Sequence, residues 1–414
     1  LPISWLGEAA VAPARQQFHD AGIASVDTPE DAVRAFAMLV TYRRNQELLM
    51  QTPSLQGGGA PADLCAVRSL IDAALADGRT LLSEPEAKAL LAACGVPVVR
   101  TRIVAATAVG AMPAPALPEG AVAAADEIGY PVALKILSPQ VSHKSAVGGV
   151  ALNLENADAV RAAAAAMLAR VAKLQSEATI AGFTVQQMVR RPAALELIVG
   201  SSIDPVFGPV LLFGAGGRSV EVVADRALAL PPLNEALARA LIARTRIARL
   251  MDGWHGMAPT DHAAVVRVLI AISQLLADEP RIAEIDINPL LADADGVVAL
   301  DARIRIDAKA PGGAARFTIS PYPSHLVESF EHRGHRITLR PIRPEDEVQH
   351  LRFFEALAPE DVRMRMFYSR RTMEHSELAR YTQIDYEREM AFVATEVDEH
   401  GVEQTIGVAR GICD

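Results

Sequence analysis

The sequence predicts a protein of several domains that combines α/β and α+β folds. Its 414 residues exceed what one hydrophobic core usually serves. Half of the residues are hydrophobic and 22% are charged, which is typical of globular proteins. Short runs with the character of β-strands alternate with helical patterns, and no repeat is present. Several mixed domains, each with its own core, are therefore expected.

Composition also excludes some classes of protein. A formal net charge of −10 argues against a non-specific nucleic-acid binder, which needs a basic face to displace counterions. No run of 18 apolar residues occurs, so we expect no transmembrane helix, and the N-terminus lacks the pattern of a signal peptide. The three cysteines have neither paired nor metal-like spacing. They are interpreted as reduced thiols of a cytoplasmic protein.

One helix is clearly predicted in the first fifty residues. Thr28 suits an N-cap, Pro29 suits the first helical position, and Asp31 can close a capping box. The glycine-rich run 51–62 that follows has the composition of a flexible linker.

A second unit begins near residue 80. Ser83–Glu86 forms a capping box, and the helix that it starts should end at Gly95. Strands are then expected at 96–104, 132–137, 147–154, 183–189, 195–199, 210–213, 282–290 and 297–306. Helices are expected between them, at 119–128, 157–175, 233–251 and 260–277.

The C-terminal region follows a second predicted linker, rich in proline, glycine and serine, at 308–324. A strand at 337–342 and a helix at 344–357 come next. Residues 390–397 and 404–412 have the pattern of a hairpin.

Oxygen-bearing side chains gather on one predicted strand near residue 286. Because side chains alternate along a strand, Glu284, Asp286 and Asn288 share a face, and a return strand brings Asp301 to the same face. Mg²⁺ takes a few such oxygens together with phosphates. The pattern predicts a magnesium site, and the alternative is the solvated face of an edge hairpin.

Lys135 is flanked by aliphatic residues on a predicted buried strand. A lysine in such a place needs an anionic partner. A nucleotide phosphate is one candidate partner, and a structural carboxylate is the other.

Two further segments have the residues to handle phosphate. The run 213–219 follows a strand, and the N–H groups of Gly214, Gly216 and Gly217 can form an anion-binding nest. His143, beside a lysine and two serines, could accept a phosphoryl group. A generic glycine loop and a surface turn are the respective alternatives.

Taken in order, these stretches resemble the ATP-grasp region of NDP-forming acyl-CoA synthetases, relatives of the succinyl-CoA synthetase β-subunit. The matching motifs are Tyr-Pro-Val-Ala-Leu-Lys (130–135), Ser-His-Lys-Ser-x-x-Gly-Gly-Val (142–150), Leu-Glu-Leu-Ile-Val-Gly (195–200), Asp-Pro-x-Phe-Gly-Pro (204–209) and Glu-x-Asp-x-Asn-Pro-Leu (284–290). The resemblance covers about 80–310. It implies a two-lobed ATP-grasp module that binds ATP or ADP with Mg²⁺.

The resemblance also implies roles for single residues. Lys135 would contact the nucleotide phosphates, and Glu196 would help to position the nucleotide. Asn288 and Asp301 match the Mg²⁺ ligands of the family, with Glu284 beside them.

The flanking regions resemble other domains. Residues 1–50 look like the tail of a flavodoxin-like CoA-ligase domain, and 337–346 resembles the opening of a GNAT acyltransferase. His143 matches a histidine that relays phosphate in acetate-forming relatives. The expected domains are the tail (1–50), a linker and leading helix (51–79), the ATP-grasp domain (80–310), a linker (311–330) and the N-terminal part of a GNAT domain (331–414).

Three functions remain open at this point. A synthetase-like region fused to GNAT resembles bacterial protein lysine acetyltransferases, which use acetyl-CoA to modify acyl-CoA synthetases. The second is an NDP-forming ligase that makes a CoA thioester through a phosphohistidine, and the third is a silent regulatory module that senses nucleotide or CoA. No GNAT loop for the acetyl-CoA pyrophosphate occurs before Asp414, so this chain alone is not expected to acetylate. Expected partners are nucleotide, CoA thioester and protein lysines, with a homo-oligomer left open.

Overall fold

The computed structural model describes residues 3–4, 7, 9–54, 62–105, 116–138, 147–174, 180–217, 224–310, 312–313, 316–366, 373–397 and 401–412. They form two compact units, a larger one at 55–321 and a smaller one that combines 1–54 with 322–414. Within the described ranges, no helix has both the length and the apolar character needed to cross a bilayer.

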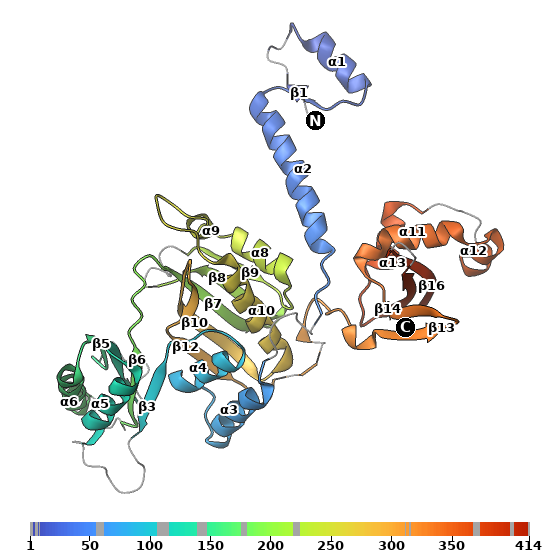
Figure 1. Cartoon of the computed structure of the whole chain (residues 1–414). Helices are drawn as coiled ribbons and strands as arrows, with labels where there is room; N and C mark the ends of the chain where they lie inside the picture. The colour runs from blue at the N-terminus through green and yellow to red at the C-terminus, as the bar shows by residue number, and fades with distance from the viewer. Residues whose placement is uncertain are drawn as a thin grey trace. The chain divides into compact units, whose positions relative to one another are not determined.

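The larger unit contains two lobes, each built on its own sheet (Figure 1). The first, here called the core lobe, has six strands in the order β11-β10-β7-β8-β9, with β12 also pairing with β10. All pairings are antiparallel. The strands are β7 (Leu195–Asp204), β8 (Gly208–Ala215), β9 (Arg226–Ala229), β10 (Ile282–Asp293), β11 (Gly296–Ala299) and β12 (Ala302–Ile306).

Within the described part of the core lobe, five helices share one hydrophobic core with its sheet. The helices are α3 (Leu64–Ala76), α4 (Glu84–Ala93), α8 (Glu235–Ala243), α9 (Ala248–Met251) and α10 (His262–Asp278). The N-terminus of α4 is fixed because the Glu86 carboxylate accepts hydrogen bonds from the backbone N–H and the hydroxyl of Ser83.

The second lobe, here called the cap lobe, has a separate core. Its antiparallel sheet runs in the order β3-β6-β4-β5, and helices α5 (Ala116–Ile128) and α6 (Ala157–Leu174) pack together beside it (Figure 1). The strands are β3 (Thr101–Ala105), β4 (Val132–Leu137), β5 (Val150–Leu154) and β6 (Gly182–Gln187). The two separate cores agree with the two-lobed architecture expected for this region.

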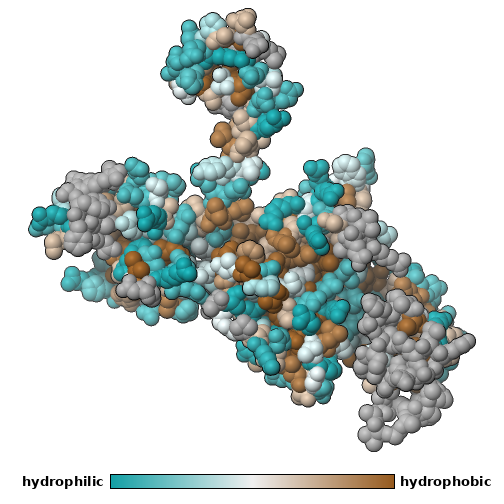
Figure 2. Space-filling model, turned by 180° about the vertical axis from the view of Figure 1, so that it is seen from behind, coloured by the Kyte–Doolittle hydropathy of each residue, from teal (hydrophilic) through white to brown (hydrophobic). Residues whose placement is uncertain are grey.

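The smaller unit begins with a parallel pair, β1 (Ile3–Ser4) and β2 (Ser25–Val26), and helices α1 (Ala12–Asp20) and α2 (Pro29–Leu49). The predicted cap of α2 is present, since the Thr28 hydroxyl oxygen accepts the Asp31 N–H at 3.1 Å. No residue of α2 is buried, and Phe36 and Tyr42 are among its exposed hydrophobic side chains. Figure 2 shows hydrophobic residues exposed among hydrophilic ones on one face of the molecule.

The C-terminal part of the smaller unit is a four-stranded antiparallel sheet in the order β13-β14-β15-β16. The strands are β13 (Glu328–His332), β14 (His335–Pro341), β15 (Glu389–Val397) and β16 (Glu403–Ile412). Two short 3₁₀ turns, η2 (Ser324–Leu326) and η3 (Pro344–Asp346), and three helices, α11 (Glu347–Ala356), α12 (Pro359–Met366) and α13 (His375–Thr382), complete it.

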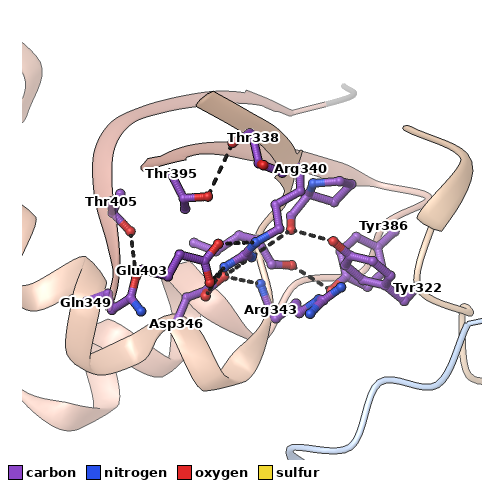
Figure 3. Close-up of polar contacts among 12 residues, drawn as sticks. Tyr322, Thr338, Arg340, Arg343, Asp346, Gln349, Tyr386, Thr395, Glu403 and Thr405 are labelled. Carbon is purple, nitrogen blue, oxygen red and sulfur yellow. Dashed lines mark hydrogen bonds and ion pairs between the residues drawn. The ribbon is translucent and has the colours of Figure 1, made fainter. Parts of the chain in front are cut away.

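A buried ion pair fixes this sheet to the turn that follows β14 (Figure 3). The Arg340 guanidinium donates to both carboxylate oxygens of Asp346, each at 2.7 Å, and to Glu403 at 3.3 Å. Nearby, the Tyr322 hydroxyl donates to the Pro341 carbonyl. The last residues before this domain are therefore fastened to it.

The structure corrects several expectations of the sequence. Helix α3 lies within the range 51–79, for which a linker and a leading helix were expected, and it adds Val67 and Ile71 to the core of the following lobe because its apolar face packs against α4. The run 233–251 is two helices, since the Asp225 carboxylate accepts the N–H groups of Arg246 and Ile247 and holds a turn between them. The run 297–306 is likewise split, into β11 and β12. The predicted linker at 51–62 lies largely outside the described residues.

Candidate functional site

The cap lobe presents Lys135 from the middle of β4. Its side chain is only 12% exposed, and its Nζ lies 2.6 Å from a carboxylate oxygen of Glu84 and 3.9 Å from one of Asp301. The structural carboxylate expected as one possible partner is thus Glu84. The nearby Asp301 belongs to the opposite lobe.

Glu84 has a second cationic partner, Lys88, one helical turn further along α4. The same carboxylate oxygen lies 2.9 Å from the Lys88 Nζ, which also donates to the Gln186 side-chain oxygen at 2.8 Å. Lys88 is 3% exposed. Burial lowers the pKa of Lys88, and the neighbouring Glu84 charge acts in the opposite direction.

Asn288 and Asp301 come together where β10 leaves β12 and begins to pair with β11. Ile287 lies opposite Ala302, and Leu290 lies opposite Ala299, so Asn288 and Asp301 fall in the gap between these pairs. An amide oxygen and a carboxylate are suitable Mg²⁺ ligands, and Mg²⁺ usually takes only one or two protein carboxylates besides phosphate and water. This donor set fits a magnesium ion that also binds phosphate.

Glu284 does not join that pair. It precedes Asn288 by four strand positions, which is about 13 Å, whereas Mg²⁺ ligands lie about 2.1 Å from the ion. Its carboxylate instead pairs with Arg305 at 3.0 Å. Among the residues that the structure describes, no three His, Cys, Asp or Glu side chains form a group able to hold a metal.

Asp286 lies between Glu284 and Asn288 on β10. Burial raises its pKa, and the charges of Glu284 and Asp301 raise it further, while Arg303 opposes the shift. Glu284 and Asp301 therefore disfavour the charged form of Asp286, and a divalent cation at this face would offset that repulsion.

The glycine run after β8 reaches the same place. The Gly217 N–H donates to the Asn288 side-chain oxygen at 2.9 Å, and the Gly216 N–H donates to the Glu196 carbonyl at 2.7 Å. Gly217 has a φ of +79°, and a Cβ there would lie 1.8 Å from the Glu196 carboxylate. Glycine suits this left-handed backbone, and a larger residue would have to displace the Glu196 carboxylate.

Gly214 has a packing role in the structure. It lies within β8, and a Cβ at this position would meet the Asp225 carbonyl oxygen at 2.1 Å. Its absent side chain lets the backbone before β9 approach closely.

His143 and residues 218–223 of the glycine run lie outside the described residues, so the roles expected for them stay predictions. The structure does bring together Lys135, Glu196, Gly216, Gly217, Asn288 and Asp301 through the contacts given above.

Sequence reasoning missed Glu84, Lys88 and Gln186 as members of this group. A signal for one of them was present, since Lys88 falls among the apolar positions Ala87, Leu90 and Leu91, all of which are buried. A lysine on the buried face of a helix requires an anionic partner. The identity of that partner depends on tertiary packing, which the local pattern does not contain.

Comparison with known proteins places this geometry in context. A model of a family described as an ATP-grasp domain matches residues 73–306. The β subunit of the ADP-forming acetate–CoA ligase I of Pyrococcus furiosus is 34% identical over 237 residues, which are 57% of this chain and 96% of that protein. The ADP-forming 4-hydroxybutyrate–CoA ligase of Nitrosopumilus maritimus is 35% identical over 239 residues, 57% of this chain but 32% of that protein.

Solved structures agree with these relatives. A dinucleotide-forming acetyl-coenzyme A synthetase of Ca. Korarchaeum cryptofilum, in complex with coenzyme A and Ca-AMPCP, is 38% identical with a TM-score of 0.53. The match covers 58% of this chain and 99% of that one. A Mg-AMPPCP complex of the same enzyme, described with its phosphohistidine segment pointing towards the nucleotide binding site, is 36% identical with a TM-score of 0.50. It covers 58% of this chain and 100% of that one.

Proposed function

The chain belongs to the ATP-grasp domain family, and on that premise we propose that residues 55–321 are the nucleotide-binding part of an ADP-forming acyl-CoA ligase. The observation that carries the proposal is the approach of Lys135, from the cap lobe, to Asp301, from the core lobe. The relatives favour this ligase, the second of the functions left open by the sequence, over the lysine acetyltransferase that the sequence favoured.

The residues of the site would divide the work by charge. Lys135 would neutralise phosphate oxygens, while the Gly217 N–H, which donates to the Asn288 side-chain oxygen, would orient that oxygen beside the nucleotide. Asn288 and Asp301 would hold Mg²⁺, which supplies charge neutralisation for phosphoryl transfer. Glu196, held against Gly217, would contact the nucleotide.

The complete reaction would convert a carboxylic acid, ATP and CoA into acyl-CoA, ADP and inorganic phosphate. The γ-phosphoryl group would pass from ATP, by way of His143, to the carboxylate, and the CoA thiol would then displace it as inorganic phosphate. The use of CoA and of an acyl group is proposed from the relatives, which are CoA ligases. His143 is proposed as the phosphoryl acceptor on the strength of the sequence resemblance.

Titration calorimetry with Mg-ADP and Mg-ATP tests the proposal on the intact chain. An Asn288→Ala/Asp301→Ala double variant should lose the magnesium-dependent part of the affinity. Glu119→Gln, an exposed residue paired with Arg161 on the cap lobe, is the matched control and should bind normally. Binding that is absent at millimolar nucleotide, or that survives in the double variant, would reject the site.

We also propose, as a second and independent function, that residues 331–414 open an acetyltransferase domain. The supporting observation is the order of strand β14, helix α11 and the β15–β16 hairpin, which matches the strand, helix and hairpin expected at 337–342, 344–357 and 390–412. Helices α12 and α13 lie between α11 and the hairpin. Acetyl-CoA-dependent labelling of a lysine substrate by the full natural protein tests it. If the lysine substrate stays unlabelled while ligase activity is present, the acetyltransferase proposal is rejected and the ligase proposal stands.

A further inference from the structure

The arrangement behind Lys135 is a chain of side chains that crosses from one lobe to the other. It starts at Gln186 on β6 of the cap lobe and passes to Lys88 and Glu84 on α4 of the core lobe. It then returns to Lys135 on β4 of the cap lobe. Gln186 also donates to the Leu300 carbonyl, at 3.4 Å, beside Asp301.

Two buried ammonium groups share one carboxylate oxygen in this chain. The Glu84 oxygen lies 2.6 Å from the Lys135 Nζ and 2.9 Å from the Lys88 Nζ. Buried charges are tolerated when they are paired and hydrogen-bonded, and Lys88 meets this condition through Glu84 and Gln186. At 3% exposure Lys88 is out of reach of a ligand, so its effect on a ligand is expected to pass through Glu84 and Lys135, whose charges it meets.

Lys135 differs from Lys88 because, among the residues that the structure describes, only Glu84 lies within hydrogen-bonding distance of its ammonium group. Its ammonium has three N–H donors, and Glu84 accepts one of them within hydrogen-bonding distance. Asp301, at 3.9 Å, lies beyond that distance. A lysine held at one donor by a fixed carboxylate keeps its direction and can still donate to an arriving anion.

We propose that Lys88, Glu84 and Gln186 are positioning residues that hold Lys135 for the nucleotide phosphate and tie its orientation to the contact between the two lobes. This rests on the proposed function, and it deepens it by naming what aims Lys135. Phosphate binding would leave the Glu84 contact in place and use the remaining donors of Lys135. The two lobes would then be joined in two ways, by these side-chain contacts and by the nucleotide.

The test is a double-mutant cycle on Mg-ADP affinity, measured by titration calorimetry on the intact chain. Lys88→Met removes the inner cation while keeping a side chain of similar length, and we expect the Kd to rise about tenfold. Lys135→Met should raise it by at least as much. We call the chain Gln186–Lys88–Glu84–Lys135 the relay. In the Lys135→Met background, adding Lys88→Met should change the Kd less than twofold, because the relay acts on the nucleotide only through Lys135.

Arg79→Met is the matched control. Arg79 pairs with Glu86 on the first turn of the same helix, at 2.8 Å, and within the described part of the chain neither residue has a hydrogen bond or ion pair with Glu84 or Lys135. Its Kd should stay within twofold of the parent. Equal weakening by Arg79→Met, or losses that multiply in the double variant, would mean that Lys88 acts on general helix stability, and the relay would be rejected.

Gln186→Met perturbs the relay from the other lobe, with an expected threefold rise in Kd, and it serves if Lys88→Met does not fold. Different results would reject nucleotide binding by Lys135 and positioning of Lys135 by its neighbours. Normal binding by Lys135→Met would reject the proposed role of Lys135 in nucleotide binding. Weak binding by Lys135→Met together with normal binding by Lys88→Met and Gln186→Met would reject the relay alone.

Discussion

Two groups of the described residues, one in each unit, place a buried cation against a carboxylate, and they differ in the balance of charge. In the smaller unit, one guanidinium, Arg340, meets two carboxylates, Asp346 and Glu403 (Figure 3). In the larger unit, two ammonium groups, Lys88 and Lys135, share Glu84. Both groups are largely withdrawn from water, so both must be paired to be tolerated.

The first group is complete within the protein. Burial opposes the charge of Arg340, but the hydrogen bonds and charges of Asp346 and Glu403 raise its pKa. Asp346 also accepts the Arg343 N–H at 2.8 Å, which fastens the turn after β14. The second group has more cation than its carboxylate can neutralise, and the next acid, Asp301, belongs to the proposed metal site. A closed group of charges holds a fold, whereas a group with a surplus cation is suited to an anionic ligand.

The largest expected effect comes from opening the closed group. Asp346→Ala leaves the Arg340 charge buried with only its weaker partner, so the unfolding free energy of the smaller unit should fall by about 3–5 kcal/mol. Scanning calorimetry should show a lower transition temperature, while the Kd for Mg-ADP stays unchanged. Glu355→Ala, at an exposed position on α11, is the control. A matching loss in the control would show that the sheet is sensitive to any change on this face.

The next effect comes from removing the shared carboxylate. Glu84→Gln leaves Lys88 without an anionic partner, and we expect the larger unit to lose about 3 kcal/mol near neutral pH. Because the folded-state pKa of Lys88 is already lowered, the unfolded state binds more protons than the folded state between that pKa and the ordinary lysine value. Stability should therefore recover as pH rises through that window.

Urea unfolding of Glu84→Gln at several alkaline pH values checks this sign, with Glu119→Gln measured in parallel. A loss of stability that is the same at every pH would contradict the role of Lys88. It would indicate that the amide simply packs less well than the carboxylate.

A smaller free-energy change is expected for Lys135→Met. Hydrogen bonds to charged groups contribute about 1.5–3 kcal/mol, so Mg-ADP binding should weaken roughly 10–100-fold. The fold should be retained because Glu84 keeps its contact with Lys88. Titration calorimetry measures the affinity and circular dichroism measures the fold. An unchanged affinity would indicate that the group around Glu84 has a structural role, like the group around Arg340.

The smallest effect is expected at Glu284. Its carboxylate is 41% exposed and paired with Arg305, and exposed pairs of this kind contribute about 0–1 kcal/mol. Glu284→Ala should alter the magnesium dependence of nucleotide binding less than twofold. A loss comparable to that of Asp301→Ala would return Glu284 to the metal site.

Local patterns predicted much of this fold. The expected strand at 132–137 and the helix at 157–175 match β4 and α6 within a residue, because their periodicities are strong and their caps and neighbours agree. The helix expected at 233–251 was wrong, since a side chain from before β9, Asp225, holds the turn that divides it. Such distant hydrogen bonds are not visible in a local pattern.

The candidate site followed the same rule. Lys135, Asn288 and Asp301 carried recognisable motifs, and the structure gathers them. Glu84 was noticed only as part of a capping box, yet its carboxylate turns inward while Glu86 makes the cap. Which of two nearby acids faces a buried lysine is decided by packing between α4 and the cap lobe, and no spacing rule encodes it.

Tyr322 has a consequence for the order of folding. Its N–H donates to the Pro53 carbonyl at 3.1 Å, so the smaller unit joins two points of the chain separated by the whole of 55–321. Closing an unfolded loop of that length costs about 5 kcal/mol of chain entropy, before any constant term. Folding of the intervening unit first would shorten the effective loop. The contact of Tyr322 with Pro53 should therefore form late, after the larger unit has its native fold.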